Sequence, residues 1–144
     1  MTGSEPNTGL LLFYPYRALE TRVLAALAAA GFDLTLAQAR VLQRVGRDGS
    51  RLTELAAQAQ VTKQTAGFLV DQLQQHGYVQ RVPDPSDGRA RLVRLGPRGR
   101  AAVALAAPVV AEVEAEWTAH LGPEAMAALR SALVRLREVT DPWA

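Results

Sequence analysis

The sequence predicts a mainly α-helical protein that carries one small β hairpin. Two stretches lead to this fold class. Residues 61–79, VTKQTAGFLVDQLQQHGYV, have the spacing of a helix with one apolar face. Residues 83–91, PDPSDGRAR, have the proline and glycine content of a turn between two short strands. With a further helix just before them, this order of elements is that of a winged helix-turn-helix.

Composition limits the class of protein. A chain of 144 residues with 49% hydrophobic residues is long enough for one domain with a sizeable core. The absence of cysteine excludes disulfides, thiolate metal sites and cysteine redox sensing. No apolar run is long enough to span a bilayer, and the start, MTGSEPNTG, lacks the basic region of a signal peptide. We therefore expect a cytoplasmic protein without membrane association.

Positive charge is concentrated in the middle of the chain. Residues 1–36 hold two arginines and three acids (net −1), and residues 37–100 hold eleven basic residues and five acids (net +6). Residues 101–144 hold three arginines and six acids (net −3). Such a distribution is what a phosphate-binding surface requires, although chance clustering of solvated arginines would give the same sums.

The elements before residue 61 are predicted to be helical. Residues 10–30 have apolar side chains on one helical face, and Gly31 ends that helix. Thr35 and Gln38 form a capping box for the next helix. A short helix follows at about residues 53–58. The first of these helices is too apolar to be a solvated arm, so we expect it to pack on another helix, from this chain or a second copy.

The helix of residues 61–79 is the principal element. Thr62 is its predicted N-cap and Gly77 its C-terminal stop. The predicted buried face is Ala66, Leu69, Val70 and Leu73, and the opposite face is Gln64, Phe68, Asp71 and Gln75. After the hairpin, a long helix is expected from Pro97 to about residue 120. A last helix from Pro123 has Met126, Leu129, Leu133 and Leu136 on one face.

The N-terminal residues of a helix in the major groove contact base edges. Glutamine pairs with adenine, lysine meets guanine or phosphate, and threonine or phenylalanine contacts a thymine methyl group. The alternative is a surface helix with incidental polar residues, which accounts poorly for an apolar Phe68 on a polar face. The candidate contacts are Thr62, Lys63, Gln64, Thr65, Gly67 and Phe68.

The hairpin supplies the other candidate contacts, Asp87, Arg89 and Arg91. A narrow minor groove has an enhanced negative potential that attracts an inserted arginine. Since Asp87 cannot favour DNA by its charge, we expect it to form a hydrogen-bonded pair that fixes Arg89 before binding. The alternative is an ordinary surface hairpin whose charges pair with one another.

The sequence gives little support for an enzymatic function. His76 and His120 are the only histidines, and neither lies in a cluster with acids at metal-ligand spacing. The acidic run Glu112, Glu114 and Glu116 has the pattern of a solvated helix face. We predict no catalytic residue, no metal site and no cofactor.

The segment LTELAAQAQVTKQTAGFLVDQLQQHGYVQRVPDPSDGRARLVRLGPRGR resembles the MarR family of bacterial transcription regulators, most specifically in DPSDGRARLVRLGPRG. The resemblance implies that Arg89 enters the minor groove with support from Asp87, and that the helix from Thr62 occupies the major groove. The sequence departs from the family pattern at Phe68, where many relatives have a polar or basic residue, and at Gly96, where threonine is common.

The resemblance also implies a homodimer on double-stranded DNA with a pseudo-palindromic operator. Residues 1–33 would form a tail and dimerisation helix, residues 34–96 the winged helix-turn-helix, and residues 97–144 the C-terminal dimerisation helices. A small aromatic or amphipathic effector is implied between the two regions. Phe13, Tyr14, Tyr16 and Trp117 are the candidate ligand-binding residues, with a core or dimer-interface role as the alternative for each.

The predicted function is a sequence-specific DNA-binding transcriptional regulator, a ligand-responsive repressor acting as a homodimer. The alternative is a winged-helix module that binds proteins instead of DNA, with Phe68 in its contact patch.

Overall fold

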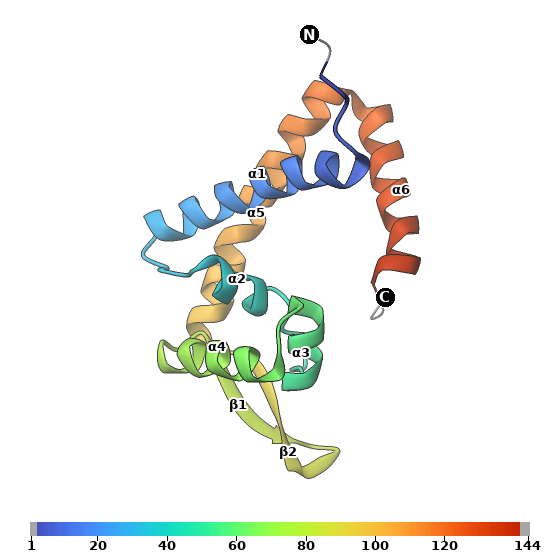
Figure 1. The fold of residues 1–144 in the computed structure, drawn as a ribbon. Coiled ribbons are helices and arrows are strands. Elements are labelled where there is room, and N and C mark those ends of the chain that lie inside the picture. Colours follow the sequence, from blue (N-terminus) through green and yellow to red (C-terminus); the bar gives the residue numbers. More distant parts are fainter. Residues whose placement is uncertain (1–2, 142–144) are drawn as a thin grey trace.

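The structure is a computed structural model, which describes residues 3–141. Within these residues the chain forms six helices and one antiparallel two-stranded sheet, so the predicted fold class is confirmed (Figure 1). The elements are α1 (Thr8–Ala29), α2 (Leu36–Leu42), α3 (Leu52–Ala59), α4 (Lys63–Gln75), β1 (Val79–Asp84), β2 (Asp87–Leu95), α5 (Pro97–Leu121) and α6 (Pro123–Thr140).

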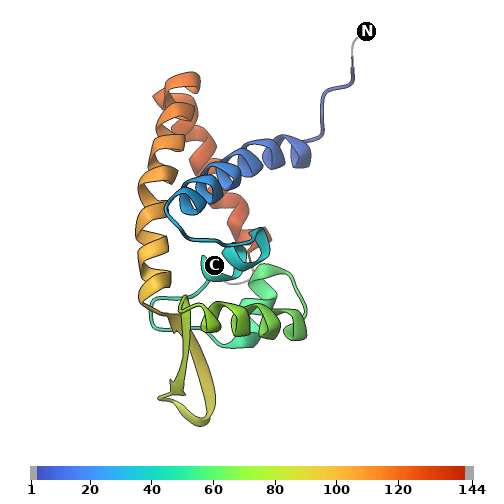
Figure 2. The same ribbon diagram turned by 90° about the vertical axis from the view of Figure 1, so that its left-hand side faces the viewer.

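The molecule has two ends. Helices α2, α3 and α4 lie together at one end, and the β1–β2 hairpin projects beyond them (Figures 1 and 2). The long helix α5 runs from the base of the hairpin to the other end, where α6 turns back, and α1 crosses α5 between its two ends (Figures 1 and 2). None of the helices in the described part of the chain has the length and hydropathy of a membrane span.

The core lies where α2, α3 and α4 pack on the base of the hairpin. Its fully buried side chains include Leu55, Leu73, Val41, Val70 and Val79. The predicted apolar face of α4 is confirmed, because its buried residues are Ala66, Leu69, Val70 and Leu73.

Local signals in the sequence set the ends of these helices. The capping box at the start of α2 is confirmed, since the Thr35 and Gln38 side chains each accept the other's backbone N–H. At the end of α4, Gly77 has a φ of +80°, and the N–H of Tyr78 donates to the carbonyl of Leu73 at 2.8 Å. This left-handed turn directs the chain from α4 straight into β1.

The start of α5 packs closely against that same corner. A Cβ atom on Gly99 would lie 2.0 Å from the carbonyl oxygen of Tyr78, so only glycine allows this approach. Arg98 reaches over the corner, and its Nη2 donates to the carbonyl of Gly31 at the end of α1 (2.9 Å). This hydrogen bond ties the end of α1 to the first turn of α5.

The hairpin differs from its predicted form. We expected a connection spanning residues 83–91, but the strands continue to Asp84 and resume at Asp87, with only Pro85 and Ser86 in the turn. The cause is Asp84, whose Oδ1 accepts the backbone N–H (2.8 Å) and hydroxyl (2.7 Å) of Ser86. An aspartate that bonds the residue two positions ahead forms a tight turn by itself.

Helices α1 and α6 bury little within the chain. Leu27 is the only buried residue of α1, and α6 has none. The exposed large apolar side chains of α6 are Leu129, Leu133, Val134, Leu136 and Val139. Residues 1, 2 and 142–144 of the predicted dimerisation segments lie outside the described residues.

Candidate nucleic-acid interface

The first turns of α4 present a polar edge to solvent. Lys63, Gln64 and Thr65 are exposed, as is Phe68 one turn further on. Thr62 is the N-cap, and its Oγ1 accepts the N–H of Thr65 at 3.0 Å. Free N–H groups at a helix start favour a negative group nearby.

These side chains differ in whether they make hydrogen bonds within the chain. The Thr62 hydroxyl donates to the Thr65 hydroxyl at 2.9 Å, so both are used in the cap. Within residues 3–141, no hydrogen bond or ion pair holds the side chains of Lys63 or Gln64. Gly67 is half-buried toward α3, where a Cβ would lie 3.7 Å from Leu52 Cδ2. The structure thus brings Lys63 and Gln64 to the surface, and turns Gly67 away from it.

The acidic residue of α4 is neutralised from the hairpin. Asp71 follows Phe68 on the exposed side of the helix, and Arg81 Nη2 of β1 lies 2.8 Å from its Oδ1. The Arg81 side chain also donates to Gln74 Oε1. One arginine therefore removes a charge that would repel phosphate and fixes β1 against α4.

A bulge places Arg89 near the tip of the hairpin. Asp84 pairs with Asp87 and Pro83 pairs with Arg91, which leaves Gly88, Arg89 and Ala90 between the two pairs on β2. Bulges bend a strand and re-aim its side chains. Arg89 is exposed, and no ion pair holds its guanidinium within the described residues.

The predicted hydrogen-bonded pair of Asp87 and Arg89 is present, and it involves the backbone of Arg89. Asp87 Oδ1 accepts the backbone N–H of Arg89 at 3.0 Å, not its guanidinium. The carboxylate supplies an acceptor where the bulge interrupts the strand pairing, so it shapes the backbone and leaves the arginine side chain free. Arg91, two residues on, is also exposed.

A partly buried ion pair that the sequence did not reveal anchors the hairpin. Asp84 is buried, and its Oδ2 accepts from Nη2 (2.9 Å) and Nε (3.2 Å) of Arg51, the residue before α3. The hydrogen bonds from Ser86, and then those from Arg51, hold the pKa of Asp84 below its ordinary value. The spacing Asp-Pro-Ser is a turn signal that could have singled out Asp84, but nothing in the sequence points to Arg51.

Comparisons with known proteins agree with this geometry. A sequence profile of the MarR family matches residues 32–90. The chain is 30% identical to a MarR family protein of Mycobacterium tuberculosis, whose structure is a complex with salicylic acid; the match covers 92% of this chain and 98% of the other, with a TM-score of 0.67. The chain belongs to the MarR family of transcriptional regulators.

Two further MarR-like structures extend the comparison. The chain is 29% identical to the transcriptional repressor CouR bound to a 23-mer DNA duplex, over 90% of this chain and 92% of the other, with a TM-score of 0.68. It is 25% identical to MarR itself, over 92% and 96% of the two chains, with a TM-score of 0.74. None of the curated proteins compared matches the sequence. The winged helix-turn-helix of this MarR family member is therefore a DNA-binding region.

A pocket of about 150 Å³ lies between α1, α2 and α5 of the MarR fold. Of the predicted ligand-binding residues, only Tyr16 lines it. Phe13 and Tyr14 lie elsewhere on α1 with their rings 6.4 Å apart, and Trp117 is half-buried near the far end of α5. Three helices meet around the pocket, so helical spacing within α1 alone could not identify its lining.

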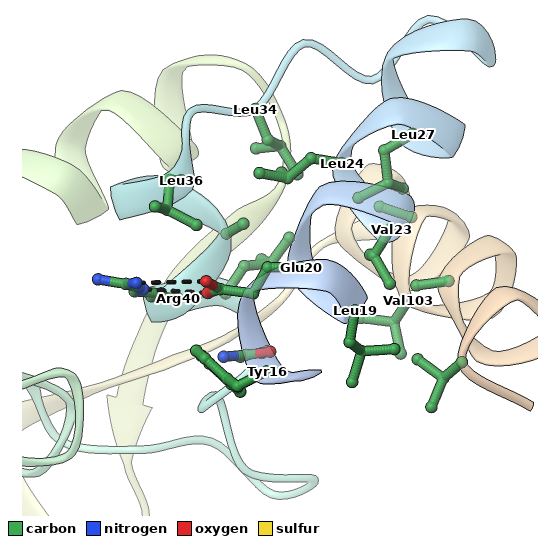
Figure 3. A pocket seen from close by; sticks show the side chains of 16 residues that line it. Tyr16, Leu19, Glu20, Val23, Leu24, Leu27, Leu34, Leu36, Arg40 and Val103 are labelled. Atoms are coloured by element: carbon green, nitrogen blue, oxygen red, sulfur yellow. Dashed lines mark hydrogen bonds and ion pairs between the residues drawn. The ribbon is translucent and has the colours of Figure 1, made fainter. Parts of the chain in front are cut away.

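Sequence reasoning missed the ion pair in this pocket. Arg40 of α2 donates from Nε and Nη2 to the two carboxylate oxygens of Glu20 on α1, at 3.1 and 3.3 Å (Figure 3). The rest of the lining is mostly aliphatic and includes Leu19, Val23, Leu24, Leu34, Leu36 and Val103 (Figure 3). Within residues 3–141, no cluster of three or more His, Asp or Glu side chains could hold a metal ion.

Proposed function

We propose that this MarR family member is a homodimeric, ligand-responsive repressor that binds a pseudo-palindromic operator. The observation that carries the proposal is the free, exposed Arg89 at the bulge, together with an α4 edge whose acidic residue is paired with Arg81. In the proposed complex Arg89 enters the minor groove. The first turns of α4 enter the adjacent major groove, with Lys63 and Gln64 toward the bases or phosphates.

The unburied apolar surface supports a dimer. Helix α6 has 18 residues and a stripe of leucines, but no residue of it is buried. A continuous exposed apolar helix face of this kind marks a surface that binds another protein surface. We assign residues 1–33 and 97–144 to dimerisation and residues 34–96 to DNA binding. Two copies of α4 would then lie about 34 Å apart, one helical turn of DNA.

The pocket supports a small acidic effector. The Mycobacterium tuberculosis relative was solved with salicylic acid. In this chain a cavity of about 150 Å³ is lined by aliphatic side chains and by Arg40. A cavity of that size accepts a benzene-sized ring. A carboxylate could take the place of Glu20 on Arg40 with the same two-point geometry, which would loosen α1 from α2.

Repression follows from the same arrangement. A dimer that covers one or two turns of operator blocks access to a promoter at that site. The relative CouR is described as a repressor and was solved on DNA. Release by effector would relieve the block.

The test compares Arg89→Ala with Arg135→Ala. Arg135 is an exposed arginine of α6. A rotation of 100° per residue puts it on the side of the helix away from the leucine stripe. Both changes remove one positive charge per chain. We expect Arg89→Ala to weaken operator binding by about tenfold or more, and to lower the salt slope by up to about two for two wings. Arg135→Ala should leave both unchanged.

Dimerisation is checked in parallel by sedimentation. Equal affinities and salt slopes for the two variants would contradict the role of Arg89. If the wild type shifts no duplex even at low salt, DNA binding itself is contradicted, and the protein-interaction module becomes the better interpretation.

A further inference from the structure

Phe68 is an exposed aromatic ring on a polar helix edge. Its side chain is 61% exposed, more than any other large apolar side chain in the described residues except Val139. The side chains one turn away on the helix surface are all polar: Gln64, Thr65, Asp71 and Gln72. The ring therefore has no apolar neighbour on α4 to pack against.

The fold does not use this ring. The buried face of α4 is the opposite one, and it contacts α2, α3 and β1. Within residues 3–141, the aromatic and cation–π contacts involve Phe13, Tyr14, Phe32, Tyr78 and Arg98, and none involves Phe68. Replacing Phe68 should therefore cost the folded state little.

The proposed dimer does not cover the ring either. Helix α4 lies beside the hairpin, whereas α1 crosses α5 on the other side of α2 and the turn from α5 to α6 lies farther away (Figure 1). Phe68 is instead next to the residues proposed to face DNA. The acid that follows it, Asp71, is already paired with Arg81 at 2.8 Å, so the surface around the ring carries no unpaired negative charge from α4.

The major groove offers one apolar group, the 5-methyl group of thymine, and its other base-edge groups are hydrogen-bond donors and acceptors. A phenyl ring can make no hydrogen bond, so this methyl group is the chemistry that it can recognise. From Gln64 to Phe68 the helix rises about 6 Å. Base pairs are spaced about 3.4 Å apart.

We propose that Phe68 reads a thymine methyl group within about two base pairs of the base that Gln64 contacts. The inference rests on the proposed DNA-binding mode of α4 and adds a chemical specificity to it. The operator half-site then contains one thymine whose methyl group, and not its Watson–Crick pairing, is required for tight binding.

The probe is the duplex that the wild-type protein selects from a random pool. Each thymine of the selected site, together with its symmetry mate, is replaced in turn by deoxyuridine, which removes only the methyl group. For the wild type we expect one symmetric position at which the replacement raises Kd by about fourfold per half-site, or about fifteenfold for both. Phe68→Ala should bind the thymine duplex more weakly and lose the response to deoxyuridine at that position.

Gln75→Ala is the matched control. Gln75 is exposed on the same side of α4, two turns beyond Phe68 and outside the residues proposed to touch DNA. This variant should keep the wild-type deoxyuridine profile. In addition, the sensitive T·A pair can be changed to C·G, with either cytosine or 5-methylcytosine at that position. The wild type should bind the 5-methylcytosine duplex more tightly than the cytosine duplex, and Phe68→Ala should bind the two equally.

Two outcomes separate the inference from the function on which it rests. If the wild type selects no duplex and shifts none at low salt, the proposed function is wrong and the inference fails with it. If a duplex is selected but Phe68→Ala responds to every deoxyuridine as the wild type does, the inference alone is overturned. The ring would then be assigned to contact with a protein. Unfolding curves for both variants establish that folding is unchanged.

Discussion

Arg98 joins three elements, and its removal should lower the free energy of unfolding measurably. Its Nη2 donates to the carbonyl of Gly31 (2.9 Å), and its guanidinium carbon lies 4.8 Å from the ring centroid of Tyr78 and 5.8 Å from that of Phe32. The contact of Nη1 with the His76 carbonyl, at 3.5 Å, is at the limit of a hydrogen bond and adds little.

The magnitude follows from these contacts. A hydrogen bond from a charged donor contributes about 1.5–3 kcal/mol when buried, and less here because Arg98 is exposed. A cation–π contact at an exposed site adds about 0.5–1 kcal/mol. We therefore expect Arg98→Ala to lower the free energy of unfolding by about 1–3 kcal/mol. At about 3 °C per kcal/mol for a chain of this size, the Tm should fall by about 3–9 °C.

The assay is urea and thermal unfolding followed by circular dichroism at one fixed protein concentration, because association shifts apparent stability. Arg98→Lys is the companion variant. Lysine keeps a positive charge near the Tyr78 ring but lacks the planar guanidinium with its several N–H donors. We therefore expect an intermediate loss in the free energy of unfolding. An Arg98→Ala protein with the wild-type urea midpoint and slope would refute this account of the corner between α1, α4 and α5.

The other predictions concern the hairpin, the dimer and the pocket. Because the hydrogen bonds from Ser86, and then those from Arg51, lower the pKa of Asp84, its stabilising effect should be complete above the ordinary carboxyl pKa near pH 4 and lost as the pH falls through the lower folded-state pKa. The stability difference between wild type and Asp84→Asn should thus be constant from pH 7 to about pH 4 and shrink below it; a difference that grows with acidification would contradict this. Leu133→Asp should give monomers in sedimentation without loss of helix content, and a persistent dimer would remove α6 from the interface. Arg40→Gln should abolish the Tm increase that salicylate gives the wild type, and an equal increase in both proteins would place the effector elsewhere.

Much of the helical part of the fold could be predicted because its signals are local. The Thr35 and Gln38 capping box, the Thr62 cap and the Gly77 stop each involve residues within a few positions of one another. The buried face of α4 also follows from one helix's own periodicity. In each case the interacting residues are close together in sequence, so the local pattern is enough to predict the structure.

The candidate site was less accessible to sequence reasoning because its contacts are long-range. Arg51 and Asp84 are 33 positions apart, and Arg40 and Glu20 are 20 apart. Nothing in either local pattern distinguishes these arginines from solvated ones. The bulge at Arg89 was also beyond prediction, since it depends on how β1 and β2 pair and not on the composition of the turn.

The exposed apolar face of α6 has a consequence for the lifetime of this regulator in the cell. If dimerisation covers that face, then a chain without a partner is the less stable species, and unpartnered chains are the ones that proteases remove first. The lifetime of the protein would rise with its own concentration. Low expression would then be cleared almost completely while higher expression persists, which gives the regulated promoter a threshold that needs no cooperativity between operator sites.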